Sequence, residues 1–168
     1  MLSFIKKLFY PSKHNAALAW QQAGNQAASA FWLYAMPVHL VLQRDTFSLA
    51  EPVPLLLENF EIEALTGSLN KHFEADGCQF YWHQNTWFLS MQTNPQIATK
   101  PPQLAINKDI RAFLPTGEGA AKWASFTNEL QMLLFEHPIN IVRETKRLPV
   151  VNSLWFYGLG QLNAAVKS

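Results

Sequence analysis

Apolar residues recur at every third or fourth position in two long blocks of the chain, which is the spacing of one face of an α-helix. The first block predicts a helix over 59–75, and Asp76-Gly77 ends it because glycine readily takes the left-handed conformation. The second block predicts a helix over 120–136, closed by His137-Pro138. We expect the apolar stripe of this second helix to be buried. Its members are Trp123, Phe126, Leu130 and Leu133.

Elsewhere apolar and polar residues alternate, which is the period of a β-strand with one buried face. Alternation on both sides of Arg44-Asp45 predicts a first hairpin, and two aromatic-rich runs on both sides of 83–86 predict a second. The Ala- and Gln-rich stretch 14–30 favours a further helix. The remaining predicted segments are a proline-containing surface connection over 93–102, one or two helical turns within 139–147, and a strand or extended segment over 152–157.

The order hairpin, helix, hairpin, helix does not follow the alternation that builds a parallel sheet. It predicts an α+β fold, in which an antiparallel sheet of hairpins carries helices packed on one face. We expect a single domain over 1–168, with 1–13 as a flexible or docked N-terminal segment that is apolar apart from a few residues such as Lys6 and Lys7.

Composition narrows the class of protein. Only 15% of the 168 residues are charged and 13% are aromatic, which excludes a disordered chain or a coiled coil. The net charge is +1 and no long basic run occurs, so nucleic acid is not an expected partner. No apolar stretch approaches the roughly 20 residues that span a bilayer. Cys78 is the single cysteine, which rules out an internal disulfide and favours a cytoplasmic location.

The densest group of chemically useful side chains surrounds the end of the second long helix. Carboxylates with a histidine can bind a divalent metal or act as an acid and a base, but this spacing matches no known metal motif. The competing interpretation, which we favour, is that these groups cap the helix, form salt bridges and satisfy backbone atoms. The residues are Glu129, Gln131, Glu136, His137, Asn140 and Arg143.

Two further segments are candidate binding surfaces. Asn152, Ser153 and Trp155 could present an amide, a hydroxyl and a ring to a small polar ligand or a peptide, but we favour a structural interpretation in which Asn152 and Ser153 satisfy a tight chain reversal and Trp155 fills the core. Trp82 and Trp87 flank the second hairpin turn. If helices cover only one face of the sheet, some of these rings lie on the outer face, and a homodimer or a protein partner would cover them.

The C-terminal third resembles a known family. Gly119–Trp123, Asn128–Leu133, Glu136–Asn140 and Leu148–Trp155 look like the bacterial RpfE-type regulatory proteins, whose members are often named as cofactor-independent phosphoglycerate mutases. Weaker similarity extends the resemblance over about 31–160. It implies a regulatory role, or an enzyme of phosphoryl or carboxylate chemistry that would use Glu129, His137, Asn140 and Arg143.

The mutase chemistry itself finds little support in the residues. A two-metal phosphoserine site needs several aspartates and histidines, whereas the chain has three scattered aspartates, Asp45, Asp76 and Asp109. It also lacks an Arg-His-Gly tripeptide, a glycine-rich phosphate loop and a dinucleotide fingerprint. We therefore expect no metal, no cofactor and no catalytic residues. The sequence favours a non-catalytic binding or regulatory module, with the enzyme and a dimerising structural subunit as alternatives.

Overall fold

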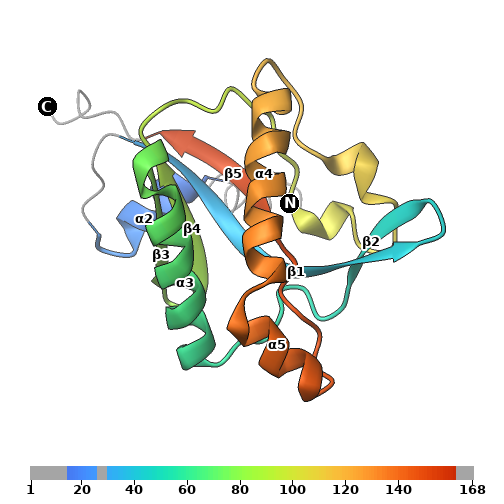
Figure 1. The fold of residues 1–168 in the computed structure, drawn as a ribbon. Helices are drawn as coiled ribbons and strands as arrows, with labels where there is room; N and C mark the ends of the chain where they lie inside the picture. Colours follow the sequence, from blue (N-terminus) through green and yellow to red (C-terminus); the bar gives the residue numbers. More distant parts are fainter. Residues whose placement is uncertain (1–14, 26–29, 162–168) are drawn as a thin grey trace, which may run out of the picture.

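A five-stranded antiparallel sheet forms the centre of the computed structural model, which describes residues 15–25 and 30–161 (Figure 1). The central strand β1 pairs with β4 through residues 31–34 and with β5 through residues 31–38, so that β4 and β5 lie on its two edges. β3 pairs with β4 at the far side. The strands are β1 (Phe31–Gln43), β2 (Thr46–Ala50), β3 (Cys78–His83), β4 (Thr86–Met91) and β5 (Ser153–Gln161).

Both predicted hairpins are present. β1 and β2 turn at Arg44-Asp45, and β3 and β4 turn at Gln84-Asn85. Gln84 and Asn85 both have positive φ, 48° and 61°, which is the backbone of the tight turns that suit the twist of paired strands. The β1–β2 hairpin extends beyond the rest of the sheet, and this arm projects to one side in Figure 1.

The two long helices pack on one face of the sheet, as the periodicity predicted. α3 (Asn59–Phe73) continues into the 3₁₀ helix η1 (Glu74–Asp76), and α4 (Ala120–Phe135) is followed by α5 (Pro138–Thr145). A core of aliphatic and aromatic side chains fills the space between α3, α4 and the sheet. On α4, Trp123 and Leu130 are buried, while Phe126 and Leu133 are partly buried against the same core. The α+β class and the antiparallel sheet of hairpins with helices packed on it are therefore confirmed.

The other face of the sheet is also covered. α2 (Ala16–Gln22) contacts β1 and β5, and its Trp20 stacks on Trp32 with ring centroids 4.7 Å apart. This helix is shorter than the predicted stretch 14–30, because Gly24 has a φ of +87°, which no α-helix continues. Residues 14 and 26–29 lie outside the described residues. Beside α2, the 3₁₀ helices η2 (Pro102–Leu104) and η3 (Ile110–Phe113) cover the half of β1 nearer to β2.

Side-chain amides close the sheet where strand pairing stops. On the edge of β3 that does not pair with β4, the Asn70 amide donates to the Phe80 carbonyl at 3.0 Å and accepts from the Phe80 N–H at 2.6 Å. One asparagine thus replaces one residue of a neighbouring strand, and both backbone groups of Phe80 are satisfied.

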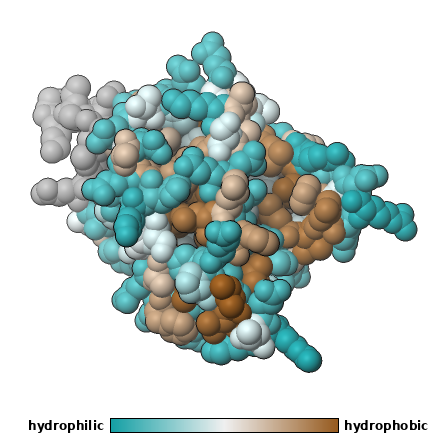
Figure 2. Space-filling view, viewed as in Figure 1, coloured by the Kyte–Doolittle hydropathy of each residue, from teal (hydrophilic) through white to brown (hydrophobic). Residues whose placement is uncertain are grey.

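Several large apolar side chains remain exposed on the surface. On α4, Met132 and Phe135 are 73% and 82% exposed. Ile141 and Val142 on α5 are also exposed, and so are Leu42 and Phe47, which pair across the β1–β2 hairpin. In Figure 2, hydrophobic surface shows near the lower end of the molecule, where α5 lies in Figure 1. Within the described ranges, no helix is both long and apolar enough to cross a membrane.

Candidate functional site

The polar residues predicted around the end of α4 serve mainly to join α5 to the rest of the protein. Asn140 is 4% exposed, and its amide nitrogen donates to the carbonyls of Leu134 and Val151 at 2.7 and 2.8 Å. Its amide oxygen accepts from the Val151 N–H at 2.8 Å. All of these contacts are to backbone atoms, so Asn140 fixes the chain that leads into β5 and has little left to offer a ligand.

Arg143 forms a buried ion pair with Glu61 at the start of α3. One guanidinium nitrogen donates to both carboxylate oxygens, at 3.0 and 2.8 Å, and Nε donates to the Pro149 carbonyl at 2.8 Å. The two side chains are 4% and 6% exposed. Glu61 also accepts from the Glu58 N–H and so completes the capping box of α3. This pair binds α5 to α3.

His137 is the N-cap of α5. Its Nδ1 accepts from the Ile139 N–H at 3.1 Å, and its Nε2 lies 2.8 Å from Ser68 Oγ on α3. Because Nδ1 accepts a hydrogen bond, the proton of the neutral ring is on Nε2 and points at the serine. Burial lowers the pKa of His137, which keeps this ring neutral. A histidine that donates to the serine cannot take its proton, so Ser68 and His137 do not form an activated nucleophile.

Glu129 and Gln131 on α4 point in different directions. Glu129 is exposed and lies 2.7 Å from His72 Nε2 on the surface between α4 and α3. Gln131 instead donates to Ser153 Oγ at 3.0 Å, at the first residue of β5. The structure therefore does not bring Glu129 to Asn140 or Arg143, and the predicted polar residues do not converge on one site.

Asn152 and Trp155 have structural roles inside the protein and are not presented to a ligand. The Asn152 amide accepts from the Leu40 N–H at 2.7 Å and donates to the Leu40 carbonyl at 2.8 Å, which extends the pairing of β1 with β5 by one step. Trp155 is 7% exposed, and its Nε1 donates to the Lys100 carbonyl at 2.8 Å. Both residues are used inside the protein.

The expectation that Trp82 and Trp87 lie on an outer face needs correction for Trp87. Trp87 is 2% exposed in the core beneath α3, and its Nε1 donates to Thr66 Oγ at 2.9 Å. Trp82 and Trp87 both pack against the core on the α3 side of the sheet, and the second face is not open either, because α2 covers it and packs on Tyr81 and Phe88. Trp82 is directly across the hairpin from Trp87, with ring centroids 5.9 Å apart, and is only half-buried.

No group of three or more histidine, cysteine, aspartate or glutamate side chains comes close enough to hold a metal ion within 15–25 and 30–161. The three aspartates belong to separate segments. Asp109 is the N-cap of η3. Its carboxylate accepts hydrogen bonds from the side chain and the backbone N–H of Arg111, and these contacts lower the pKa of Asp109. Asp45 is in the β1–β2 turn, and Asp76 ends η1.

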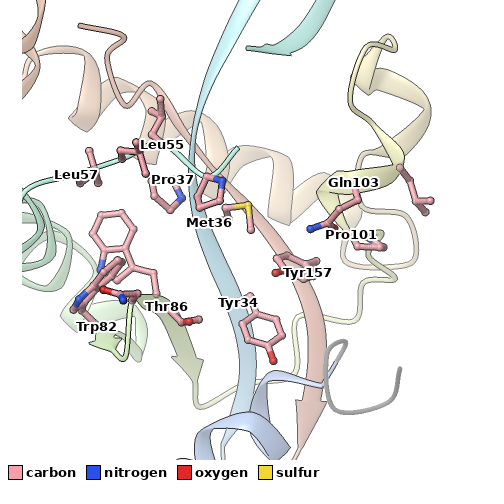
Figure 3. Close-up of a pocket in the computed structure, with 15 residues that line it drawn as sticks. Tyr34, Met36, Pro37, Leu55, Leu57, Trp82, Thr86, Pro101, Gln103 and Tyr157 are labelled. Carbon is pink, nitrogen blue, oxygen red and sulfur yellow. The ribbon is translucent and has the colours of Figure 1, made fainter. Parts of the chain in front are cut away.

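A wide hollow opens at a break in the sheet. β1 pairs with β4 up to Tyr34 and with β2 from His39 onward, and between these points no described strand pairs with that edge. A groove of about 840 Å³ lies there, which is within the usual range for ligand sites (Figure 3). We call it the break groove. Its lining residues are Tyr34, Met36, Pro37, Pro54, Leu55, Leu56, Leu57, Trp82, Asn85, Thr86, Trp87, Pro101, Gln103, Leu104 and Tyr157.

Five segments build this groove. Tyr34 and Met36 of β1 and Tyr157 of β5 lie between two walls, as Figure 3 shows. Residues 54–57 and the tip of the β3–β4 hairpin form one wall, and residues 101–104 around η2 form the other. The 54–57 segment is held against β1 by a hydrogen bond from Leu55 N–H to the Pro37 carbonyl at 3.0 Å.

The break groove carries no charge. Its lining contains no lysine, arginine, histidine, aspartate or glutamate. Burial raises the pKa of Tyr157 to about 12, with a smaller contribution from Tyr34, and burial also raises the pKa of Tyr34. Both phenols therefore stay neutral at physiological pH. The groove offers aromatic and aliphatic surface together with a few neutral polar groups, the usual make-up of a site for an uncharged ligand.

Sequence reasoning missed this groove. None of its lining residues except Trp82 and Trp87 was singled out, because a groove that joins five distant segments leaves no local spacing to detect. One signal was present. Pro37 lies in the middle of the β1 sequence, and a proline within a strand marks a position where the pairing stops.

Comparison with known proteins gives a likeness in fold. No family model matches the chain, and no curated protein matches it in sequence. The structure is similar to a cofactor-independent phosphoglycerate mutase from Thermoplasma acidophilum DSM 1728, with a TM-score of 0.61 and 16% identity. The similarity covers 95% of this chain but 44% of the mutase, so the chain spans less than half the length of that protein. The mutase side of the sequence resemblance is thus supported at the level of the fold.

Proposed function

We propose that the protein is a non-catalytic binding module whose ligand occupies the break groove. The observation that carries this proposal is a contrast between the two kinds of candidate residue. Most of the ionisable residues around the end of α4 are engaged with side chains of α3 or with the backbone, whereas the break groove is aromatic, uncharged and open. The resemblance to RpfE-type proteins supports a regulatory use of such binding, and the single buried cysteine fits a cytoplasmic protein.

Binding of the uncharged dye Nile red to the full-length protein tests this proposal. Trp82→Ala removes the half-buried ring that lines the groove, and we expect it to weaken binding at least tenfold. Met132→Ala is the matched control, because Met132 is an exposed apolar residue on α4 that does not line the groove. Equal affinities for the two variants and the wild type would place the dye elsewhere and refute the proposal.

The fold likeness to part of a mutase favours one other candidate, an enzyme of phosphoryl or carboxylate chemistry that uses Glu129, His137, Asn140 and Arg143. Conversion of 3-phosphoglycerate by the purified protein, measured with and without manganese, discriminates the two functions. Turnover that disappears in Glu129→Gln would support the enzyme, since Glu129 is exposed and its replacement leaves the core intact.

A protein partner or a second copy of the chain remains a further proposal. Trp87 cannot supply the contact because it is buried in the core. The exposed apolar residues of α4 and α5 are the alternative surface. Light scattering at micromolar concentration, compared between the wild type and Phe135→Ser, shows whether a dimer forms and whether α4 contributes to it.

A further inference from the structure

The protein already uses a tryptophan to hold one of its own proline segments beside the break groove. Trp155 Nε1 donates to the Lys100 carbonyl at 2.8 Å, and Pro101 and Pro102 follow directly. Pro101 has φ −66° and ψ 149°, which is the polyproline II conformation. Pro101 is also part of the groove wall. An indole N–H that donates to a carbonyl next to an extended proline is thus an interaction that this fold makes internally.

The groove itself is lined by a tryptophan, Trp82, whose N–H is available for the same interaction. Trp82 lines the groove and is half-buried, with its ring held edge to face against Trp87. Within 15–25 and 30–161, no hydrogen bond engages Trp82 Nε1, whereas Trp87 and Trp155 each donate to an internal acceptor. Trp82 can therefore donate to a ligand without giving up an internal hydrogen bond.

The backbone at the groove does not favour an added β-strand. A peptide that extends a sheet needs alternating N–H and carbonyl groups along the strand edge. At the centre of the break, Pro37 has no N–H, and its carbonyl already accepts from Leu55. A bound peptide must instead be recognised by rings and by side-chain donors, which is how aromatic grooves bind polyproline II segments.

The charge and the hydrogen-bonding groups of the groove lining also favour a proline-rich segment as the ligand. The groove lining has no ionised group, and its neutral polar side chains include the amides of Asn85 and Gln103 besides Trp82. Proline presents an apolar ring and a carbonyl acceptor with no N–H to satisfy, so a proline-rich segment complements this lining in both respects. A charged peptide would have to leave its hydration without gaining an ionic partner.

We propose that the break groove binds a proline-rich segment of a partner protein in the polyproline II conformation. A proline ring packs against Trp82, and a carbonyl of the segment accepts from Trp82 Nε1–H. This inference rests on the proposed binding function of the groove and specifies the class of its ligand.

Calorimetric titration of the full-length protein with a decapeptide of alternating proline and alanine tests the proposal. A decapeptide of alternating glycine and alanine is the control, since it has neither the rings nor the preformed conformation, and we expect it not to bind. Trp82→Phe keeps an aromatic ring but removes the N–H, so the proline peptide should bind about fivefold more weakly. Trp82→Ala removes both features, and we expect a loss of about 30-fold or more. Met132→Ala should bind like the wild type.

The outcomes separate this inference from the function on which it rests. If the proline peptide fails to bind while Nile red still binds in a manner that depends on Trp82, the ligand class is wrong and the groove remains a binding site. If the peptide binds with equal affinity to the wild type and both Trp82 variants, it binds elsewhere and the inference is refuted. If the circular dichroism signal shows that Trp82→Ala does not fold, the inference is tested with Trp82→Phe and with displacement of Nile red by the proline peptide.

Discussion

Replacement of Arg143 by alanine is the sharpest test of how α5 is attached to the protein. The substitution removes two charge-assisted hydrogen bonds to Glu61 and one hydrogen bond to the Pro149 carbonyl. Glu61 is left as a buried carboxylate with the Glu58 N–H as its remaining described partner. The removal of one member of a buried ion pair typically costs about 3–5 kcal/mol. We expect a loss in this range for Arg143→Ala.

A double substitution separates the net contribution of the Arg143–Glu61 ion pair to the free energy of unfolding from the destabilisation caused by one unpaired buried charge. In Glu61→Leu combined with Arg143→Met, neither charge is buried, and the side-chain volumes are nearly kept. Two backbone groups, the Pro149 carbonyl and the Glu58 N–H, lose their partners, and Glu58 is exposed to water. We therefore expect the double variant to be at least about 1 kcal/mol more stable than Arg143→Ala, because the stranded carboxylate is gone.

Urea unfolding at pH 7, followed by circular dichroism and by tryptophan fluorescence, measures both free energies of unfolding. The two probes should give coincident transitions if unfolding is two-state, which justifies the comparison. A loss under about 1 kcal/mol for Arg143→Ala would show that water reaches Glu61 and that the pair is not buried in solution. A double variant less stable than Arg143→Ala would contradict the assigned cost of the lone carboxylate.

Three further predictions follow from other parts of the structure. Leu130→Ala should lower the free energy of unfolding by about 2–5 kcal/mol because Leu130 is fully buried. Met132→Ala, on the exposed face of α4, should change the free energy of unfolding by less than about 0.5 kcal/mol. Equal effects of the two substitutions would contradict the assigned orientation of α4. The protein should not convert 3-phosphoglycerate with manganese present, and turnover lost in Glu129→Gln would overturn this. Because the folded pKa of His137 lies below its ordinary value, the unfolded chain binds the proton more readily, so stability should fall as the pH drops below about 6.5. Urea unfolding between pH 7 and pH 5 measures this slope, and His137→Asn, which keeps an N-cap without a titrating ring, should flatten it; an unchanged slope would assign it to other groups.

Local patterns were sufficient to predict most of the secondary structure. Leu65 and Leu69 recur at helical spacing within α3, and Gly77 closes η1 in the left-handed conformation that the sequence suggested. The turn at Gln84-Asn85 was equally local. These features depend on neighbours within a few residues, which is why the pattern alone defined them. The length of α2 was overestimated because one glycine, Gly24, outweighs the helical preference of the alanines around it.

The site depended on contacts that no local pattern contains. Whether Trp87 is buried depends on α3 covering its face of the sheet, while α2 takes up Tyr81 and Phe88 on the other face, and thus on how rings from distant segments share two cores. Arg143 and Glu61 are 82 residues apart in the sequence. The break groove arises because β1 is longer than either partner on one edge, and this is a property of strand register.

The asparagine side chains that pair with backbone groups make parts of this fold sensitive to a change of a single atom. Asn70, Asn140 and Asn152 each donate to the carbonyl and accept from the N–H of one other residue, which is Phe80, Val151 and Leu40 respectively. Conversion of such an amide to a carboxylate, the product of spontaneous deamidation, replaces the donor by a negatively charged acceptor. The backbone carbonyl that had accepted from the amide would then face a like charge in place of its hydrogen bond. Chemical ageing at these three positions would therefore loosen the edge of β3 and the start of β5 while leaving the shape of the side chain unchanged.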